Sequence, residues 1–293
     1  MSNVKAGKRS GKNKSTKVKA QTMADLADRH VLYQMAVQAP DAELEFFEDR
    51  FKELRGRTPL IMREDFCGTA LLSTEWAKKG KKRQAIGVDI CEETLAWGLE
   101  HNLKPAGEDV VSRVQLLNEN VVDAEPALAD LICAMNFSYC IFKTRQAMIN
   151  YYKNALKGLK DDGLFYLDLL GGTNTLDVCE EEREIEGEET TYVWDQSSFN
   201  PINNHMQCYI HFDFPDGSRI ENAFEYNWRL WSLPEVQEML IEAGFSKVNI
   251  YWEEFEIDSE DPDNEYLVGT GNYRKVTEVE QQESWLAYIV AEK

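Results

Sequence analysis

A segment rich in small and acidic residues has the composition of a ligand-binding loop. It reads REDFCGTA, residues 63–70, and stands between a short buried strand that starts at 60–62 and a helix over 70–79. Open α/β sheets bind nucleotides at this position, beside the carboxyl ends of their strands. The segment is not a G-x-G-x-x-G motif and has no glycine cradle for a pyrophosphate, which disfavours NAD. A cofactor without phosphate does not need that cradle.

Three further polar segments follow later apolar runs. Asp89 ends the second run, at a spacing from Glu64 that suits a β-α-β unit, and can either accept both ribose hydroxyls or cap the following helix. The segment 118–121 follows the third run and can either read an adenine edge or form a turn. The segment 136–139 follows an almost wholly apolar run. All three therefore fall at the edge of the sheet that carries the first segment.

Apolar runs and helical patterns alternate between residues 60 and 170 and must position these segments. The predicted strands cover 60–62, 85–88, 114–117, 131–135 and 164–170, and the helices between them cover 70–79, 92–103 and 143–158. Two helices, over 24–38 and 41–54, precede them. Continuous apolar strands separated by helices indicate a mainly parallel sheet covered on both faces.

The pattern changes after residue 171. Residues 180–189 are almost all acidic and cannot be core, while 191–196, 206–214 and 219–231 alternate polar with apolar residues. We interpret 180–231 as an antiparallel β insertion that acts as a lid or a dimer surface, with a homodimer possible through it. Strands at 248–252 and 285–290 have no helix between them, and 253–265 is acidic and loop-like. The predicted fold is α/β: a Rossmann-like, mainly parallel seven-stranded sheet with helices on both faces, whose last strand is antiparallel.

With these segments in place, residues 24–293 resemble the class I S-adenosylmethionine-dependent methyltransferases. Glu64 and the sequence Cys67-Gly68-Thr69 are similar to the acid and small loop of that superfamily's first motif. Phe66 and Ala70 stand where the superfamily has glycines, which leaves the path of the loop undecided. The resemblance implies S-adenosyl-L-methionine as the cofactor and a methyltransferase activity.

The same resemblance implies a set of cofactor contacts. Glu64 and Gly68 are expected at the methionine part, Asp89 at the ribose, Asn120 with Val121 at the adenine, and Asn136 at the sulfonium. The complete expected set is Tyr33, Arg63, Glu64, Cys67, Gly68, Asp89, Ile90, Asn120, Val121 and Asn136.

Methyl transfer from a sulfonium is an in-line displacement, so the protein mainly supplies alignment and desolvation. No catalytic triad is expected, and no Cys and His spacing suggests a metal site. The catalytic candidates are Tyr139, Asp168 and Arg229, and the substrate-binding candidates are Tyr139, Trp194 and Trp228. Plain alternatives stand beside them, namely packing for the aromatic residues, a strand end for Asp168 and a surface ion pair for Arg229.

Charge is distributed unevenly along the 293 residues. The net charge is −20, but residues 1–20 carry seven Lys or Arg and no acid, which leaves −27 on residues 21–293. The basic tail, 1–22, is expected to be disordered, and serves as an address signal, a polyanion-binding arm or only a solvated tail. The acidic body disfavours a nucleic-acid substrate.

No apolar run is long enough to span a membrane, and the six cysteines have the sequence context of reduced, buried thiols. A cytoplasmic protein is therefore expected, or a nuclear one if the tail is an address.

Three functions remain open at this point. The first is a methyltransferase that transfers a methyl group to an N or O nucleophile of a small molecule, with the aromatic-rich insertion over its acceptor. The second is a protein or RNA methyltransferase whose basic tail steers the substrate. The third is a non-catalytic S-adenosylmethionine-binding protein.

Overall fold

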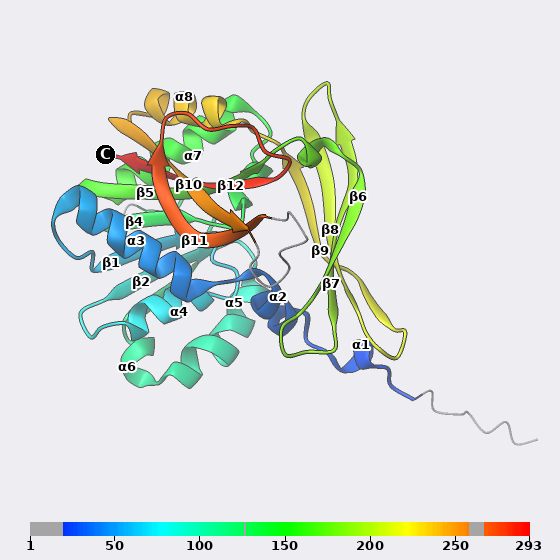
Figure 1. Cartoon of the computed structure of the whole chain (residues 1–293). Helices are drawn as coiled ribbons and strands as arrows, with labels where there is room; N and C mark the ends of the chain where they lie inside the picture. The colour runs from blue at the N-terminus through cyan, green and yellow to red at the C-terminus, as the bar shows by residue number, and fades with distance from the viewer. Residues whose placement is uncertain (1–19, 126, 258–266) are drawn as a thin grey trace, which may run out of the picture.

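The computed structural model describes residues 20–125, 127–257 and 267–293. They form an eight-stranded sheet with helices on both faces and a separate four-stranded antiparallel sheet (Figure 1). The predicted tail, apart from residues 20–22, lies outside the described residues. No helix in the described ranges is long and apolar enough to cross a membrane.

Five neighbouring parallel strands, from β5 to the edge strand β3, form one part of the large sheet, whose order is β11-β10-β12-β5-β4-β1-β2-β3. They are β1 (Ile61–Asp65), β2 (Gln84–Asp89), β3 (Val114–Asn118), β4 (Ala129–Ala134) and β5 (Leu159–Gly171). Every residue of β4 is buried, because β1 and β5 flank it and helices cover both faces. Since these strands are parallel, the predicted binding segments all emerge at one edge of the sheet.

Helices cover the two faces through separate cores. On one face, α3 (Pro40–Arg55) and α4 (Leu71–Lys78) pack Phe47, Phe51 and Trp76 against β1 and β4. On the other, α7 (Arg145–Gly158) and α8 (Leu233–Ala243) pack Met148, Tyr152 and Met239 against β5. The remaining helices are α5 (Glu92–Gly98), the π-helix Leu99–Leu103, α6 (Glu108–Val111) and short 3-10 turns at Lys104–Ala106, Ser138–Ile141 and Asn174–Leu176.

The N-terminal helix expected over 24–38 is two helices, α1 (Met23–Leu26) and α2 (Arg29–Val37). Ala27 is extended, and the carboxylate of Asp28 accepts a hydrogen bond from the backbone N–H of His30 at 2.8 Å. Asp28 therefore caps a new helix, which a pattern of apolar residues alone did not reveal.

The antiparallel end of the large sheet confirms the predicted pairing and adds one strand. β12 (Trp285–Glu292) lies antiparallel between β5 and β10 (Lys247–Ile257). β11 (Leu267–Val276) then pairs with β10 and makes the outer edge, so the sheet has eight strands and not seven. The predicted loop over 253–265 is wrong where β10 extends to Ile257, and 258–265 lies outside the described residues.

The small sheet consists of β6 (Cys179–Glu184), β7 (Thr191–Asn200), β8 (His205–Asp213) and β9 (Arg219–Arg229), in that order. It stands beside the large sheet, with α2 against it (Figure 1). Phe212 and Ile210 pack on Leu32 of α2, whereas Trp228 joins the main core. The acidic stretch at 180–189 is exposed apart from Ile185, which is buried in the core that the small sheet shares with α2, so the prediction that none of it is core is wrong at this residue. The first part of the stretch forms the exposed edge strand β6.

Candidate functional site

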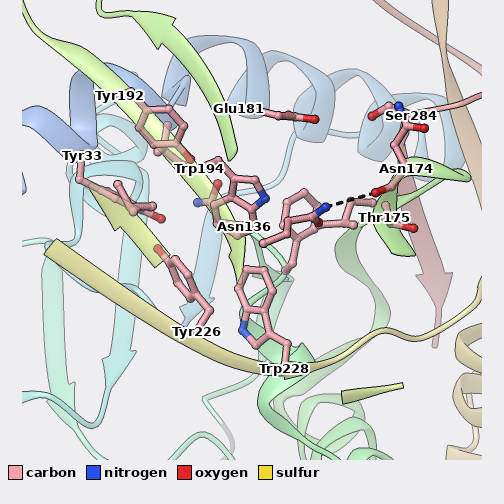
Figure 2. A pocket seen from close by; sticks show the side chains of 15 residues that line it. Tyr33, Asn136, Asn174, Thr175, Glu181, Tyr192, Trp194, Tyr226, Trp228 and Ser284 are labelled. Carbon is pink, nitrogen blue, oxygen red and sulfur yellow. Dashed lines mark hydrogen bonds between the residues drawn. The ribbon is translucent and has the colours of Figure 1, made fainter. Parts of the chain in front are cut away.

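Two adjoining cavities open at the carboxyl edge of the large sheet, beneath the small sheet. The larger, of about 390 Å³, is lined mainly by the loops after β1, β2 and β4 together with α2 and β9. The smaller, of about 210 Å³, is lined by β5, β7, β8 and β9 (Figure 2). Four residues line both cavities: Tyr33, Asn136, Tyr226 and Trp228. A ligand in one cavity would therefore approach a ligand in the other beside these four side chains.

The loop after β1 keeps a glycine-like path without the glycines. Phe66, Gly68 and Ala70 all have left-handed φ, at 60°, 52° and 53°. This conformation is costly for Phe and Ala and persists only where the surroundings impose it. The ring of Phe66 packs on Phe142 and Tyr151, with centroids 6.1 and 5.6 Å away, which holds the turn. The departures from the superfamily motif at Phe66 and Ala70 thus leave a left-handed loop in place.

A second element fixes the end of the same loop. A Cβ added to Gly98 of α5 would lie 2.1 Å from the carbonyl oxygen of Thr69, so only glycine permits this close approach. Asn102, on the π-helix, donates a hydrogen bond to that oxygen at 2.9 Å, and Gln34 of α2 donates to the Thr69 hydroxyl at 2.7 Å. The loop is therefore held by contacts with α5 and the π-helix and by a hydrogen bond from α2.

Glu64, at the end of β1, lines the larger cavity as a buried carboxylate. Its Oε2 accepts hydrogen bonds from the backbone N–H of Ser73 at 2.9 Å and from the Ser73 hydroxyl at 2.5 Å. Burial raises the pKa of Glu64 to about 7, although the Ser73 hydrogen bonds oppose the change. No Lys or Arg in the described residues pairs with it, so a cationic ligand is the partner that would stabilise its charge.

Asp89, at the tip of β2, also lines the larger cavity. Its Oδ2 accepts from the backbone N–H of Gly68 and its Oδ1 from that of Cys91, both at 2.8 Å. Asp89 thus ties together the loops after β1 and β2. It does not cap the following helix α5, which begins after Cys91 and has no side-chain cap. The carboxylate keeps lone pairs for a ligand in the cavity, which it and Gly68 both line.

Four of the expected cofactor contacts do not line either cavity. Arg63 is wholly buried, where its Nε donates to Asp65 Oδ1 at 2.6 Å. Ile90 is 73% exposed, Asn120 is exposed and accepts from the backbone N–H of Val122, and Val121 is packed in the core. The structure therefore gives no support to these four as side-chain ligands. The other six, namely Tyr33, Glu64, Cys67, Gly68, Asp89 and Asn136, line the larger cavity.

The turn after β4 places Asn136 where the cavities join. Asn136 and Phe137 both have a left-handed φ of 56°. Their backbone N–H groups donate to the carboxylate of Asp168, at 2.7 and 2.9 Å. Asp168 is buried on β5, and burial raises its pKa to about 7. Asp168 therefore holds the turn and, contrary to the catalytic role expected for it, lines neither cavity.

The other two catalytic candidates are also outside the cavities. Tyr139 is fully buried, and its hydroxyl donates to the backbone oxygen of Asp168 at 2.7 Å. Arg229 donates to the backbone oxygen of Lys143 and to Glu235, and its guanidinium lies 3.7 Å from the ring centroid of Trp231. Both bind protein groups and line neither cavity, so the assignment of Tyr139 to catalysis and substrate and of Arg229 to catalysis stays a prediction that the cavities do not support.

Trp194 and Trp228 line the smaller cavity, where the sequence places them. Sequence reasoning missed the polar residues beside them, including Glu181, Asn174 and Ser284, and also missed His30 of the larger cavity. These come from β6, a 3-10 turn, the segment before β12 and α2, and nothing in their local sequence separates them from ordinary surface residues.

The charges of the lining residues match one kind of ligand. No Lys or Arg lines either cavity within the described residues, whereas Glu64, Asp65 and Asp89 line the larger one. Cations therefore fit better than phosphates. These carboxylates suit a sulfonium cofactor that carries an ammonium group and a ribose. They do not suit the pyrophosphate of a dinucleotide.

Comparison with known proteins gives one kind of match. No protein-family profile and no curated protein matches the sequence. Solved structures do match, including an S-adenosylmethionine-dependent methyltransferase from Clostridium acetobutylicum, 17% identical, with a TM-score of 0.63 over 89% of this chain and 96% of that one. CalS10, an amino pentose methyltransferase from Micromonospora echinaspora, is 11% identical, with a TM-score of 0.61 over 90% of this chain and 96% of that one. KedS8, a sugar N-methyltransferase from Streptoalloteichus, is 16% identical, with a TM-score of 0.59 over 98% and 99% of the two chains. The chain has the Rossmann-like fold of the class I S-adenosylmethionine-dependent methyltransferases.

Proposed function

We propose that this protein transfers a methyl group from S-adenosylmethionine to an N or O nucleophile of a small molecule. The observation that carries the proposal is the junction of an acid-lined cavity with an aromatic cavity at Tyr33, Asn136, Tyr226 and Trp228. The fold is that of methyltransferases, and the solved structures that share it include enzymes described as acting on sugars.

The larger cavity has the residues to hold the cofactor. Glu64 is placed to pair with the ammonium of the methionine part, and the Gly68 backbone lies beside it. Asp89, which lines the same cavity, is placed to accept hydrogen bonds from the ribose hydroxyls. The bound cofactor supplies an activated methyl group on a positively charged sulfur.

The smaller cavity has the residues to hold the acceptor. Its aromatic walls exclude water, and its size suits a compact molecule rather than a folded macromolecule. Asn136 and Tyr226, at the junction, are placed to orient the nucleophile in line with the methyl group. In such a displacement, alignment and desolvation supply most of the rate, so a catalytic base is needed only where a proton must leave.

The proposal is tested by following a labelled methyl group from S-adenosylmethionine into a cell extract that has been separated by size. We expect the label to enter the small-molecule fraction, and Asp89→Ala to abolish the transfer. Label found only in protein or RNA would favour a macromolecular acceptor and contradict the proposal. Binding of the cofactor without transfer to any fraction would instead favour a non-catalytic role.

A further inference from the structure

The smaller cavity lacks any group that would neutralise an anion. Within the described residues, no Lys, Arg or His lines it, and its one carboxylate is Glu181 on β6. No side-chain hydrogen bond or ion pair joins the carboxylate of Glu181, an exposed residue of β6, to another described residue. The buried carboxylates Glu64 and Asp168 lie on the same edge of the sheet. An acceptor with a carboxylate or a phosphate would find neutral amide and hydroxyl donors there but no cationic side chain among the described residues that line the cavity.

Aromatic faces form the walls of the same cavity. The ring centroids of Tyr226 and Trp228 are 4.5 Å apart, and Trp194 lies 5.8 and 5.9 Å from them. Figure 2 shows these three rings grouped around the cavity, with Tyr33 and Tyr192 beyond them. The negative faces of such rings attract a cation, most strongly where water is excluded.

Two hydroxyl groups complete the junction without adding charge. The hydroxyls of Tyr33 and Tyr226 face one another in Figure 2. Burial raises the pKa of Tyr33 to about 12 and that of Tyr226 well above its ordinary value. Both remain neutral at physiological pH, so neither is a phenolate that could remove the proton of an alcohol.

We infer that the acceptor is a compact amine, with its nitrogen at the Tyr33–Tyr226 junction and the rings of Trp194, Tyr226 and Trp228 around it. This inference rests on the proposed function and narrows it from an N or O nucleophile to nitrogen. An amine that arrives protonated first loses a proton to water. Its lone pair then forms the N–C bond as the C–S bond breaks, and the electrons of that bond remain on sulfur. The positive charge thus passes from sulfur to nitrogen, where the aromatic faces stabilise it.

Glu181 is the specificity-determining residue in this arrangement. Its carboxylate, at the wall of the cavity, is placed to attract the amine and to stabilise the methylated ammonium product. The neighbouring Glu180 is on the same strand but does not line the cavity, since successive side chains of a strand point to opposite faces. Glu180 is therefore a matched control.

The inference is tested with the protein loaded with S-adenosylhomocysteine, so that no turnover occurs. Ligand-observed NMR measures the binding of N-methylcyclohexylamine, cyclohexanol and cyclohexanecarboxylate, which share one ring. We expect the amine to bind at least about tenfold more tightly than the other two. Equal or tighter binding of the alcohol or the carboxylate would overturn the inference while leaving the proposed function in place. Failure of S-adenosylhomocysteine itself to bind would overturn the proposed function and the inference with it.

Three variants sharpen the result. Glu181→Gln should remove most of the preference for the amine, and Glu180→Gln should keep it. Trp194→Leu should weaken the amine about fivefold while cyclohexanol is little affected, and Trp194→Tyr should restore the amine. Unchanged affinity for S-adenosylhomocysteine in each variant shows that the fold is intact. Equal effects of Trp194→Leu on amine and alcohol would mean that the wall acts only by packing and would contradict the inference.

Discussion

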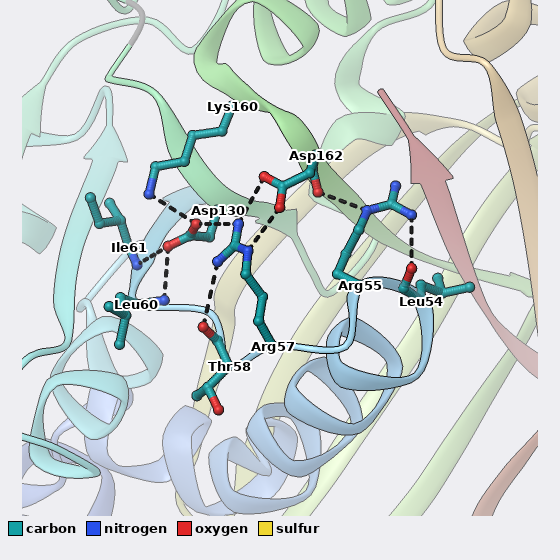
Figure 3. Close-up of polar contacts among 9 residues, drawn as sticks. All are labelled: Leu54, Arg55, Arg57, Thr58, Leu60, Ile61, Asp130, Lys160 and Asp162. Carbon is teal, nitrogen blue, oxygen red and sulfur yellow. Dashed lines mark hydrogen bonds and ion pairs between the residues drawn. The ribbon is translucent and has the colours of Figure 1, made fainter.

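Buried carboxylates at the two ends of the large sheet differ in whether cationic side chains pair with them. At the amino end, Asp130 of β4 accepts hydrogen bonds from the backbone N–H groups of Leu60 and Ile61, both at 2.8 Å. Arg57 and Lys160 donate to it at 2.8 and 2.9 Å, and Arg57 also binds Asp162 (Figure 3). Although burial opposes it, the pKa of Asp130 is held below its ordinary value by these donors, Lys160 foremost.

At the carboxyl end, Asp65 pairs with Arg63, whereas Glu64, Asp168 and Glu43 form no ion pair with a Lys or Arg among the described residues. Burial raises the pKa of Glu64 and of Asp168 to about 7, and that of Glu43 on α3 to about 8. Among the described residues, Ser73 donates hydrogen bonds to Glu64, and the turn at 136–137 donates to Asp168. The comparison teaches that the amino end contributes stability, while the carboxyl end keeps negative charge available for a cationic ligand.

The largest expected effect is at the amino end. Asp130→Ala should lower the free energy of unfolding by about 3 kcal/mol, because two backbone N–H groups lose their acceptor and Arg57 and Lys160 each lose an ion pair. Urea unfolding measures this loss. The exposed neighbour Asp161→Ala is the control and should change stability by less than about 0.5 kcal/mol. A loss of cofactor affinity without loss of stability in Asp130→Ala would break the comparison.

The next effect concerns the turn that Asp168 holds. Asp168→Asn keeps the size of the side chain but replaces one acceptor oxygen with a donor that faces a backbone N–H. We expect a loss of about 2 kcal/mol in stability and of about tenfold in kcat, with a smaller change in the dissociation constant of the cofactor. Unfolding and steady-state kinetics measure the two. An unchanged kcat would show that the position of Asn136 does not matter for transfer.

The raised pKa values predict an unusual pH dependence of stability. Between about pH 5 and 7 the folded protein retains protons on Glu64 and Asp168 that the unfolded chain has lost. Stability should therefore fall as pH rises through this range, by up to about 1.4 kcal/mol per pH unit for each group. Glu64→Gln should flatten the slope in urea unfolding at several pH values. Stability that rises over this range in wild type and variant alike would contradict the raised pKa values.

The smallest effect tests the strain in the loop after β1. Ala70→Gly should raise stability by about 1 kcal/mol, because glycine adopts a φ of 53° without cost. The control is Ala77→Gly, a buried residue in the last turn of α4, which should lower stability by at least about 1 kcal/mol. Thermal unfolding separates the two variants. Destabilisation by Ala70→Gly equal to that of Ala77→Gly would argue against a strained loop.

Features of the fold that depend on local sequence patterns could be predicted, whereas those that depend on contacts between distant residues could not. The parallel strands, the insertion and the placement of Glu64 and Asp89 follow from local apolar periods and from the rule that loops after parallel strands share one edge. β11 and β6 were missed as strands, because neither edge strand carries an apolar period: β6 is acidic and exposed, and β11 holds two glycines and several polar residues.

Side-chain roles were harder to predict. Asp168 binds backbone groups more than 30 residues away, and Arg63 pairs with the carboxylate of Asp65 inside the core. From the sequence alone, both side chains look free to bind a ligand. Only the three-dimensional arrangement shows that their polar atoms already bind other groups of the protein.

The most direct test of the central claim is calorimetric titration of the protein with S-adenosylmethionine, on wild type and on Asp89→Ala. The exposed Asp123→Ala, at the same edge of the sheet, serves as the control. We predict that wild type and control bind alike and that Asp89→Ala binds at least about a hundredfold more weakly, since it loses two charge-assisted hydrogen bonds. Absence of binding by folded wild-type protein, or equal binding by Asp89→Ala, would contradict the account.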